Sequence, residues 1–194
     1  GTEILSGLPS GSRIGTASLR RTAQVRRARS DLLPVELRGN VPTRIEKLLA
    51  GKADGLIIAR AGIMRLLSAD SGKSADSVKK IFDSVVMAPL PEDRFLPAVN
   101  QGILVAQIRT DDLRLLSVLK RISQPAVFHA FSAERAFIAT IGADCRSAVG
   151  VLARESAGRI ELFGAVYSRD GQEAIAGSEV GSVSESATIG SGLG

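Results

Sequence analysis

Four arginines follow short apolar segments near the start of the sequence, where many ligand-binding proteins hold an anion. They are Arg20, Arg21, Arg38 and Arg44. A guanidinium is a flat, permanently charged fork that pairs two-pronged with a carboxylate or a phosphate. Four of them in one region predict a ligand with several acidic groups.

Three predicted strands and two predicted helices position these arginines. The strands cover residues 13–16, 34–37 and 55–59, and the last of them is a continuous apolar run. Such runs are typical of parallel sheets that are buried on both faces. In a parallel sheet, ligands bind outside the carboxyl ends of the strands, next to the helix N-termini. The β-α-β-α-β order therefore predicts that the arginines meet at one sheet edge.

The helix starts carry capping signals. Thr16 or Ser18 can cap the first helix, whose first turn contains Arg20 and Arg21. For the second helix, residues 43–46 fit a capping box after a turn at 38–40. The backbone N–H groups of both starts add donors for an anion. An alternative interpretation makes the arginines of the first helix a solvated face, and we assign that role to Arg26, Arg27 and Arg29.

Six short motifs follow one another along the chain. They are GTASLRR at 15–21, LRGNVPTR at 37–44, AGIMR at 61–65, LPAVNQG at 96–102, SAERA at 132–136 and GADC at 142–145. In this order they resemble the porphobilinogen deaminase family, also called hydroxymethylbilane synthase. The motifs cover most of the chain, and the spacing of the first two is highly specific.

The resemblance implies a transferase of tetrapyrrole biosynthesis, the route to haem and chlorophyll. It implies that porphobilinogen is deaminated and that four units are joined head to tail into hydroxymethylbilane. It also implies a dipyrromethane cofactor, bound to Cys145 by a thioether and used as a primer. Pyrroles with acetate and propionate groups accumulate carboxylates as the product grows, which suits an arginine-rich edge.

The resemblance assigns roles to residues of this sequence. Cofactor contacts fall on Thr16, Ser18, Arg20, Arg21, Gly39, Asn40, Arg44 and Cys145. Substrate contacts fall on Arg38, Arg44, Ala59, Arg65 and Gln101. No residue receives a catalytic role, because the family's catalytic aspartate lies in a preceding domain that no segment here matches.

Cys145 is the single cysteine of the chain. Judged by residue type alone, a lone cysteine is usually a small buried hydrophobe. Next to Arg146, a thiolate suited to covalent attachment is favoured, whereas the neighbouring Asp144 opposes it.

The predicted fold class is α/β with three parts. Residues 1–95 form a periplasmic-binding-protein-like β-α-β domain with a parallel-rich sheet, residues 96–111 hold a hinge strand, and residues 112–194 form a small α+β domain that carries Cys145. The resemblance implies that the hinge strand, at 102–108, returns to the absent first domain. We therefore expect an incomplete part of the enzyme, weakly active or inactive.

The last part is predicted to contain helices followed by antiparallel strands. The helices cover 113–122 and 127–141, and the buried stripe of the second is Phe128, Phe131, Ala136 and Phe137. Glu134 and Arg135 are expected to be a surface pair. The Ser- and Gly-rich end, 181–194, is expected to stop where the family has a further helix.

Composition favours an acidic small molecule. The 194 residues carry a net charge of +5, but aromatics make up only 4% and Trp is absent, so stacking platforms for nucleic acid are scarce. We expect porphobilinogen as the partner, with no nucleic acid and no membrane, since no apolar run approaches the ~18 residues of a span. His129 and Cys145 are too few for a metal site.

A single cysteine fits a reducing compartment. The expected location is the cytoplasm, with an organelle as the open alternative, and the resemblance implies a monomer. Two rival classes remain at this point. A nucleic-acid-binding module would explain the charge but not the strand-end placement. A non-catalytic anion-binding domain of periplasmic-binding-protein type would explain that placement, and it is the runner-up.

Overall fold

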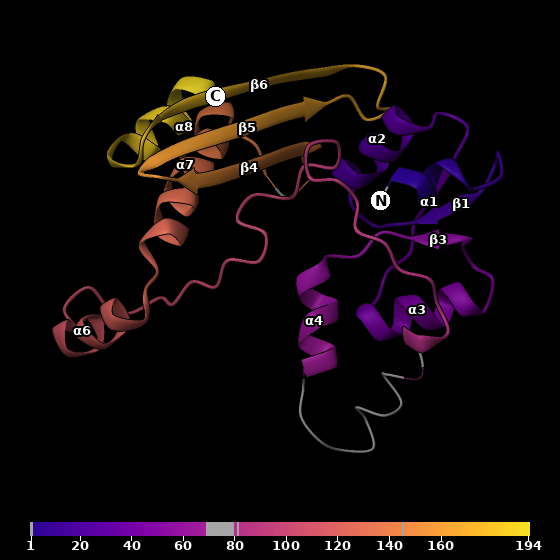
Figure 1. Ribbon diagram of the computed structural model, residues 1–194, viewed down its shortest axis with the longest axis horizontal. Helices are drawn as coiled ribbons and strands as arrows, with labels where there is room; N and C mark the ends of the chain where they lie inside the picture. Colours follow the sequence, from indigo (N-terminus) through magenta and orange to yellow (C-terminus); the bar gives the residue numbers. More distant parts are fainter. Residues whose placement is uncertain (1, 69–79, 81, 145) are drawn as a thin grey trace. The chain divides into compact units, whose positions relative to one another are not determined.

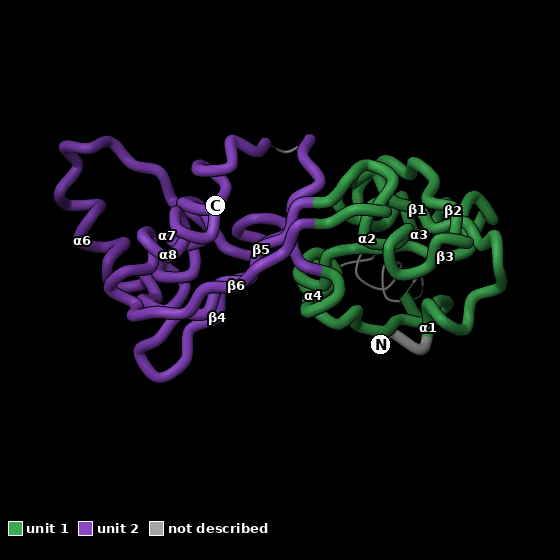
Figure 2. The backbone as a smooth tube through the Cα atoms, turned by 90° about the horizontal axis from the view of Figure 1, so that it is seen from above, with its two compact units in different colours: residues 1–95, 167–174 green, residues 96–166, 175–194 purple. Residues whose placement is uncertain are grey.

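Two units divide the chain, and a short later segment belongs to the earlier unit. The computed structural model describes residues 2–68, 80, 82–144 and 146–194. The first unit comprises residues 1–95 and 167–174, and the second comprises 96–166 and 175–194 (Figure 2). The turn at 167–174 therefore packs with the first unit, although the strands on either side of it belong mainly to the second.

A parallel three-stranded sheet lies at the centre of the first unit (Figure 1). Its strands are β1 (Arg13–Gly15), β2 (Leu33–Val35) and β3 (Gly55–Leu56), in the order β2-β1-β3. Ile14 of β1 is paired with Pro34 on one side and Gly55 on the other, both in parallel register. The predicted parallel sheet is confirmed, but β3 is two residues long rather than five.

The helices of this unit that are described in full are α1 (Thr2–Ser6), α2 (Leu19–Ala28), α3 (Val41–Leu49) and α4 (Arg60–Ser68). The buried core of the unit is formed by Leu5, Ile14, Val25 and Leu32. Because β1 and α2 both contribute to this core, the segment between them has fixed ends.

The cap of α3 differs from the prediction. Asn40 is the N-cap, its side-chain oxygen accepts from the backbone N–H of Thr43 at 2.9 Å, and Thr43 lies inside the helix. Asn is at least as good an N-cap as Thr, and Pro42 in the first turn supplies a helical φ without needing a backbone N–H. The capping-box prediction at residues 43–46 was therefore wrong by one turn.

The second unit pairs a three-stranded sheet with helices. The strands β4 (Val149–Ser156), β5 (Arg159–Tyr167) and β6 (Ala174–Ser182) lie in that order, with β4 and β5 antiparallel. The helices are α6 (Leu113–Ile122), α7 (Pro125–Ile141) and α8 (Ser186–Leu193), and the 3₁₀ helix η1 (Val183–Glu185) precedes α8. The predicted helix-then-antiparallel-strand pattern is confirmed.

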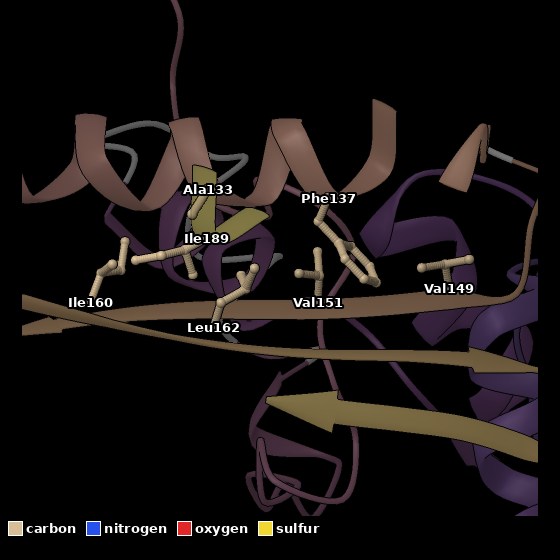
Figure 3. Packing of buried hydrophobic residues seen from close by; sticks show 7 residues of the cluster. All are labelled: Ala133, Phe137, Val149, Val151, Ile160, Leu162 and Ile189. Atoms are coloured by element: carbon tan, nitrogen blue, oxygen red, sulfur yellow. The ribbon is translucent and has the colours of Figure 1, made fainter. Parts of the chain in front are cut away.

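Alternate residues of β4 and β5 form the core under α7 and α8 (Figure 3). Val151, Ile160 and Leu162 are fully buried, and Val151 lies beneath Phe137. The predicted stripe of α7 was right for Phe137 but wrong for Phe128, which is 60% exposed. Phe128 lies in the first turn of the helix, outside the stretch that faces the sheet.

One further expectation for this unit was wrong. The predicted strand at 102–108 is absent, and Leu104 and Val105 are exposed, because no described strand offers this segment hydrogen-bonding partners. The Ser- and Gly-rich end at 181–194 contains α8. Its small residues allow a close approach to α7, and Ile189 completes the core.

The α7–α8 contact gives a stability prediction. A methyl group on Gly190 would overlap the carbonyl oxygen of Ala133, whereas one on Gly192 would meet only the movable carboxylate of Glu179. We expect Gly190→Ala to lower the free energy of unfolding by about 1–3 kcal/mol, through overpacking. Gly192→Ala, in the same helix, should change it by less than about 1 kcal/mol. Urea unfolding of both variants checks this, and equal midpoints would contradict it.

Candidate functional site

Three helix starts meet at the carboxyl edge of the β2-β1-β3 sheet. Helix α2 begins at Leu19 after β1, α3 begins at Val41 after β2, and α4 begins at Arg60 after β3. Because the strands are parallel, all three ends lie at the same edge of the sheet. The edge therefore gathers most of the residues predicted to bind the cofactor.

Thr16 and Ser18 build the link between β1 and α2. Thr16 is buried, its backbone N–H donates to Val35 O at 2.9 Å, and its hydroxyl oxygen accepts from Ser18 N at 3.2 Å. Ser18 is the N-cap, and its hydroxyl accepts from Arg21 N at 3.4 Å. Both hydroxyl groups accept hydrogen bonds from backbone N–H groups. Their direct effect is therefore to fix the start of α2 and with it the positions of Arg20 and Arg21.

Arg20 and Arg21 are held inside the protein rather than in solvent. Arg20 is 7% exposed, and burial lowers its pKa to about 10, with a smaller contribution from Arg21. Arg21 donates from Nη1 to Ile57 O at 3.0 Å. Its pKa is lowered by burial and, to a smaller degree, by Arg44. Arginine stays protonated under these shifts, so both remain cations near neutral pH.

Arg44 approaches the same site from α3. Its Nε donates to Gly39 O at 2.7 Å, across the turn that Asn40 caps. Gly39 has a φ of 129°, which L side chains rarely adopt, so the glycine is required by the turn. Within the described part of the chain, neither Arg21 nor Arg44 forms an ion pair. Two neighbouring cations without a counter-charge favour binding of an anion.

The residues predicted to contact substrate lie in several different surroundings. Arg38 is 81% exposed and pairs with Glu36 at 2.6 Å, and Arg65 is exposed on α4. Ala59 accepts from Gly62 N at 3.0 Å at the start of α4. Gln101 belongs to the second unit, where its side-chain oxygen accepts from Ala98 N at 3.5 Å. Of these four residues, Arg38, Ala59 and Arg65 belong to the first unit.

Cys145 lies outside the described residues. Its neighbour Asp144 accepts from the backbone N–H of Arg146 at 2.9 Å, from the Arg146 Nε at 3.2 Å and from the Ser147 hydroxyl at 3.1 Å. These bonds lower the pKa of Asp144, with the Arg146 backbone N–H as the largest cause. The charge of Arg146 is therefore partly balanced by Asp144.

The three arginines assigned to a solvated face have partners. Arg26 donates to Arg169 O at 3.2 Å, and Arg27 donates to Gln172 O at 3.3 Å, in the turn at 167–174. Arg29 pairs with Asp31 at 2.6 Å. An open groove of about 740 Å³ runs between Arg26, Arg27 and this turn, away from the strand-end arginines. The sequence contains no signal for these contacts, because the turn is more than 140 residues away along the chain.

His129 lies beside a carboxylate of β4. Its Nδ1 lies 2.7 Å from the Glu155 carboxylate. No group of three or more potential metal ligands among His, Cys, Asp and Glu occurs in the residues that the structure describes. None of the described helices combines the length and the apolar character needed to cross a bilayer.

Glu134 was predicted at the surface but is 5% exposed. Its carboxylate accepts from Asn100 N at 2.5 Å and from Ala153 N at 2.9 Å. Burial raises its pKa, against the effect of these two N–H donors. Glu134 therefore joins the segment that contains Gln101 to β4, and no pattern in the sequence distinguishes it from a surface glutamate.

Comparison with known families decides the relationship. Residues 1–117 match the family model described as "Porphobilinogen deaminase, dipyromethane cofactor binding domain". Residues 128–194 match the model described as "Porphobilinogen deaminase, C-terminal domain". The chain belongs to the porphobilinogen deaminase family. The match places the strand-end arginines inside the cofactor-binding domain of this family.

Individual relatives agree. A porphobilinogen deaminase of Roseiflexus castenholzii is 39% identical over 97% of this chain and 57% of its own length. A porphobilinogen deaminase of Nitrobacter winogradskyi is 38% identical over 96% of this chain and 54% of its own length. One of Sphingopyxis alaskensis is 41% identical over 89% of this chain and 50% of its own length. The chain thus spans about half the length of the curated relatives it matches.

The buried Glu134 gives a prediction on pH. Its folded pKa is raised above the ordinary 4.5, so its carboxylate lowers stability as pH rises from that value through the folded pKa. We expect Glu134→Gln to remove this step from the curve of unfolding free energy against pH. An amide offers only one acceptor oxygen, so either the Asn100 or the Ala153 N–H should exchange with solvent on the order of tenfold faster.

The matched control is Glu185→Gln, which removes an exposed carboxylate in the same unit. It should leave the pH curve and both exchange rates unchanged. If the wild type and Glu134→Gln give parallel curves between pH 4 and pH 8, Glu134 does not titrate as described.

Proposed function

We propose that this chain supplies the cofactor-binding and C-terminal parts of a porphobilinogen deaminase. The proposed reaction removes ammonia from porphobilinogen and joins four units into hydroxymethylbilane. The observation that carries the proposal is the adjacency of Arg21 and Arg44 without an ion pair in the described chain, in the domain that the family model names for cofactor binding. Carboxylates of linked pyrroles supply the missing negative charge.

The residues at the strand ends fit dipyrromethane. In the proposal, Arg20, Arg21 and Arg44 hold its carboxylates, while Thr16 and Ser18 fix the start of α2. Gly39 and Asn40 shape the turn from which Arg44 projects. When bound, dipyrromethane supplies the primer to which new pyrroles are joined. Because the guanidiniums are already partly desolvated, they bind a carboxylate more strongly than exposed arginines do.

The incoming porphobilinogen is proposed to contact Arg38, Arg65, Ala59 and Gln101. Arg38 is suited to this because its pair with Glu36 is exposed, and exposed pairs contribute little. A ligand carboxylate can therefore replace Glu36 at small cost. Cys145 is proposed to hold dipyrromethane through a thioether bond.

The finer architecture belongs to the same proposal. The first domain, 1–95, is of periplasmic-binding-protein type, residues 96–111 are a hinge, and 112–194 are the C-terminal domain. The parallel order β2-β1-β3, with ligand groups at its carboxyl edge, supports the first assignment. A monomer in the cytoplasm is proposed, in keeping with a single cysteine.

Removal of one cation should weaken ligand binding. We expect Arg21→Gln to bind porphobilinogen about tenfold or more weakly, because a charge-assisted hydrogen bond is lost. Arg159→Gln removes the same charge from an exposed site on β5 and is the matched control. Calorimetric titration of the full chain at low and moderate salt checks this. Equal weakening by both substitutions would show that only net charge matters, which contradicts the site.

Covalent attachment has a separate test. After incubation with porphobilinogen, the intact mass of the chain should rise by two linked pyrroles, and Cys145→Ser should abolish the increase because it removes the proposed nucleophile. Mass spectrometry under denaturing conditions measures this directly. Reversible binding without any increase in mass would favour a non-catalytic anion-binding domain and would refute the attachment.

A further inference from the structure

Arg20 is joined to the single tyrosine of the chain through one glutamine. Arg20 Nη1 donates to Gln24 Oε1 at 3.3 Å, and Gln24 Nε2 donates to the Tyr167 hydroxyl at 3.3 Å. Gln24 is 2% exposed. Arginine can only donate, so the amide oxygen of Gln24 must face Arg20 and its NH₂ group must face Tyr167. The orientation of the glutamine is therefore fixed by its neighbours.

Spacing on α2 explains the first half of this connection. Gln24 follows Arg20 by four residues and lies on the same face of the helix, one turn further along. A glutamine in this position can contact the guanidinium without any change in the backbone. Leucine or alanine, the strongest helix formers, would offer no acceptor.

The turn at 167–174 supplies the second half. It is held against α2 by the bonds from Arg26 to Arg169 O and from Arg27 to Gln172 O. Gly171 lies so close to the helix that a methyl group there would overlap Ala23 O. The turn thus contacts α2 at Ala23, Arg26 and Arg27, and Tyr167, at the start of the turn, lies beside Gln24.

We propose that Gln24 and Tyr167 are positioning residues that hold the Arg20 guanidinium in the orientation that binds a ligand carboxylate. The proposal rests on the proposed function, since it assigns Arg20 to the acidic pyrrole ligand. An arginine side chain loses much rotamer freedom when it is fixed. The network imposes that loss during folding, so less is lost on binding. Residues 143 positions apart in sequence thereby determine one ligand contact.

The test uses Gln24→Met and Tyr167→Phe in the full chain. Methionine keeps the length of the side chain without hydrogen bonds, and phenylalanine removes only the hydroxyl. We expect the Kd for porphobilinogen to rise about tenfold with Gln24→Met and about threefold with Tyr167→Phe, from the usual effect of one hydrogen bond. Thr140→Val removes a hydroxyl that bonds only to its own helix, and it should leave Kd unchanged.

Tyrosine emission adds a readout that a general loss of stability would not reproduce. Since the chain has one tyrosine and no tryptophan, this emission reports Tyr167 alone. Porphobilinogen should change it in the wild type and in Thr140→Val, and the change should disappear in Gln24→Met. Thermal unfolding midpoints within about 4 °C of the wild type, a shift typical of small losses of stability, would show that the variants are folded.

The outcomes separate this inference from the proposed function. If the wild type binds and both variants bind equally well, the positioning role is refuted and the function stands. If the wild type does not bind porphobilinogen, the proposed function of this chain is refuted. In that case the Arg20 Nε–H resonance in NMR spectra of the free chain decides: a shift in both variants supports positioning, and an unchanged resonance refutes it.

Discussion

Repulsion between guanidiniums at one sheet edge is the constraint on which the first unit depends. Parallel strands bring their carboxyl ends together, so Arg21 and Arg44 become neighbours although they follow different strands. Neighbouring like charges oppose folding, and hydrogen bonds that stabilise each guanidinium offset this cost. Carbonyl groups provide those bonds, Ile57 O for Arg21 and Gly39 O for Arg44. A carbonyl stabilises a cation without cancelling its charge, so the edge keeps its attraction for an anion.

The placement of the arginines after the strands could largely be predicted from the sequence. Strand-end placement is a local property: a short apolar segment, a capping residue and an arginine in the first helical turn lie within a few positions of one another. The helix start could therefore be located to within two residues, with Thr16 or Ser18 as the cap, and Ser18 is the cap in the structure. The error at α3 was also local. Asn40 and Thr43 are both good caps, and the choice between them depended on Pro42.

Contacts between distant segments could not be predicted. A glutamate in a helix looks the same in sequence whether it faces water or accepts from Asn100 and Ala153, as Glu134 does. Likewise, nothing near Gln24 indicates that a tyrosine will lie beside it. The predicted strand at 102–108 was wrong because its apolar pattern fits a strand, but strand formation needs a partner strand that the described chain does not offer.

The arginines of α2 show how helical geometry divides one charged segment among several tasks. Successive residues point about 100° apart, so neighbours in sequence face different surroundings. Arg20 contacts Gln24, Arg21 donates to Ile57 O beyond β3, and Arg26 and Arg27 bind the turn at 167–174. Arg29, the residue after the helix, pairs with Asp31. A count of positive charges treats these as equivalent. Their amide, carbonyl and carboxylate partners make them different.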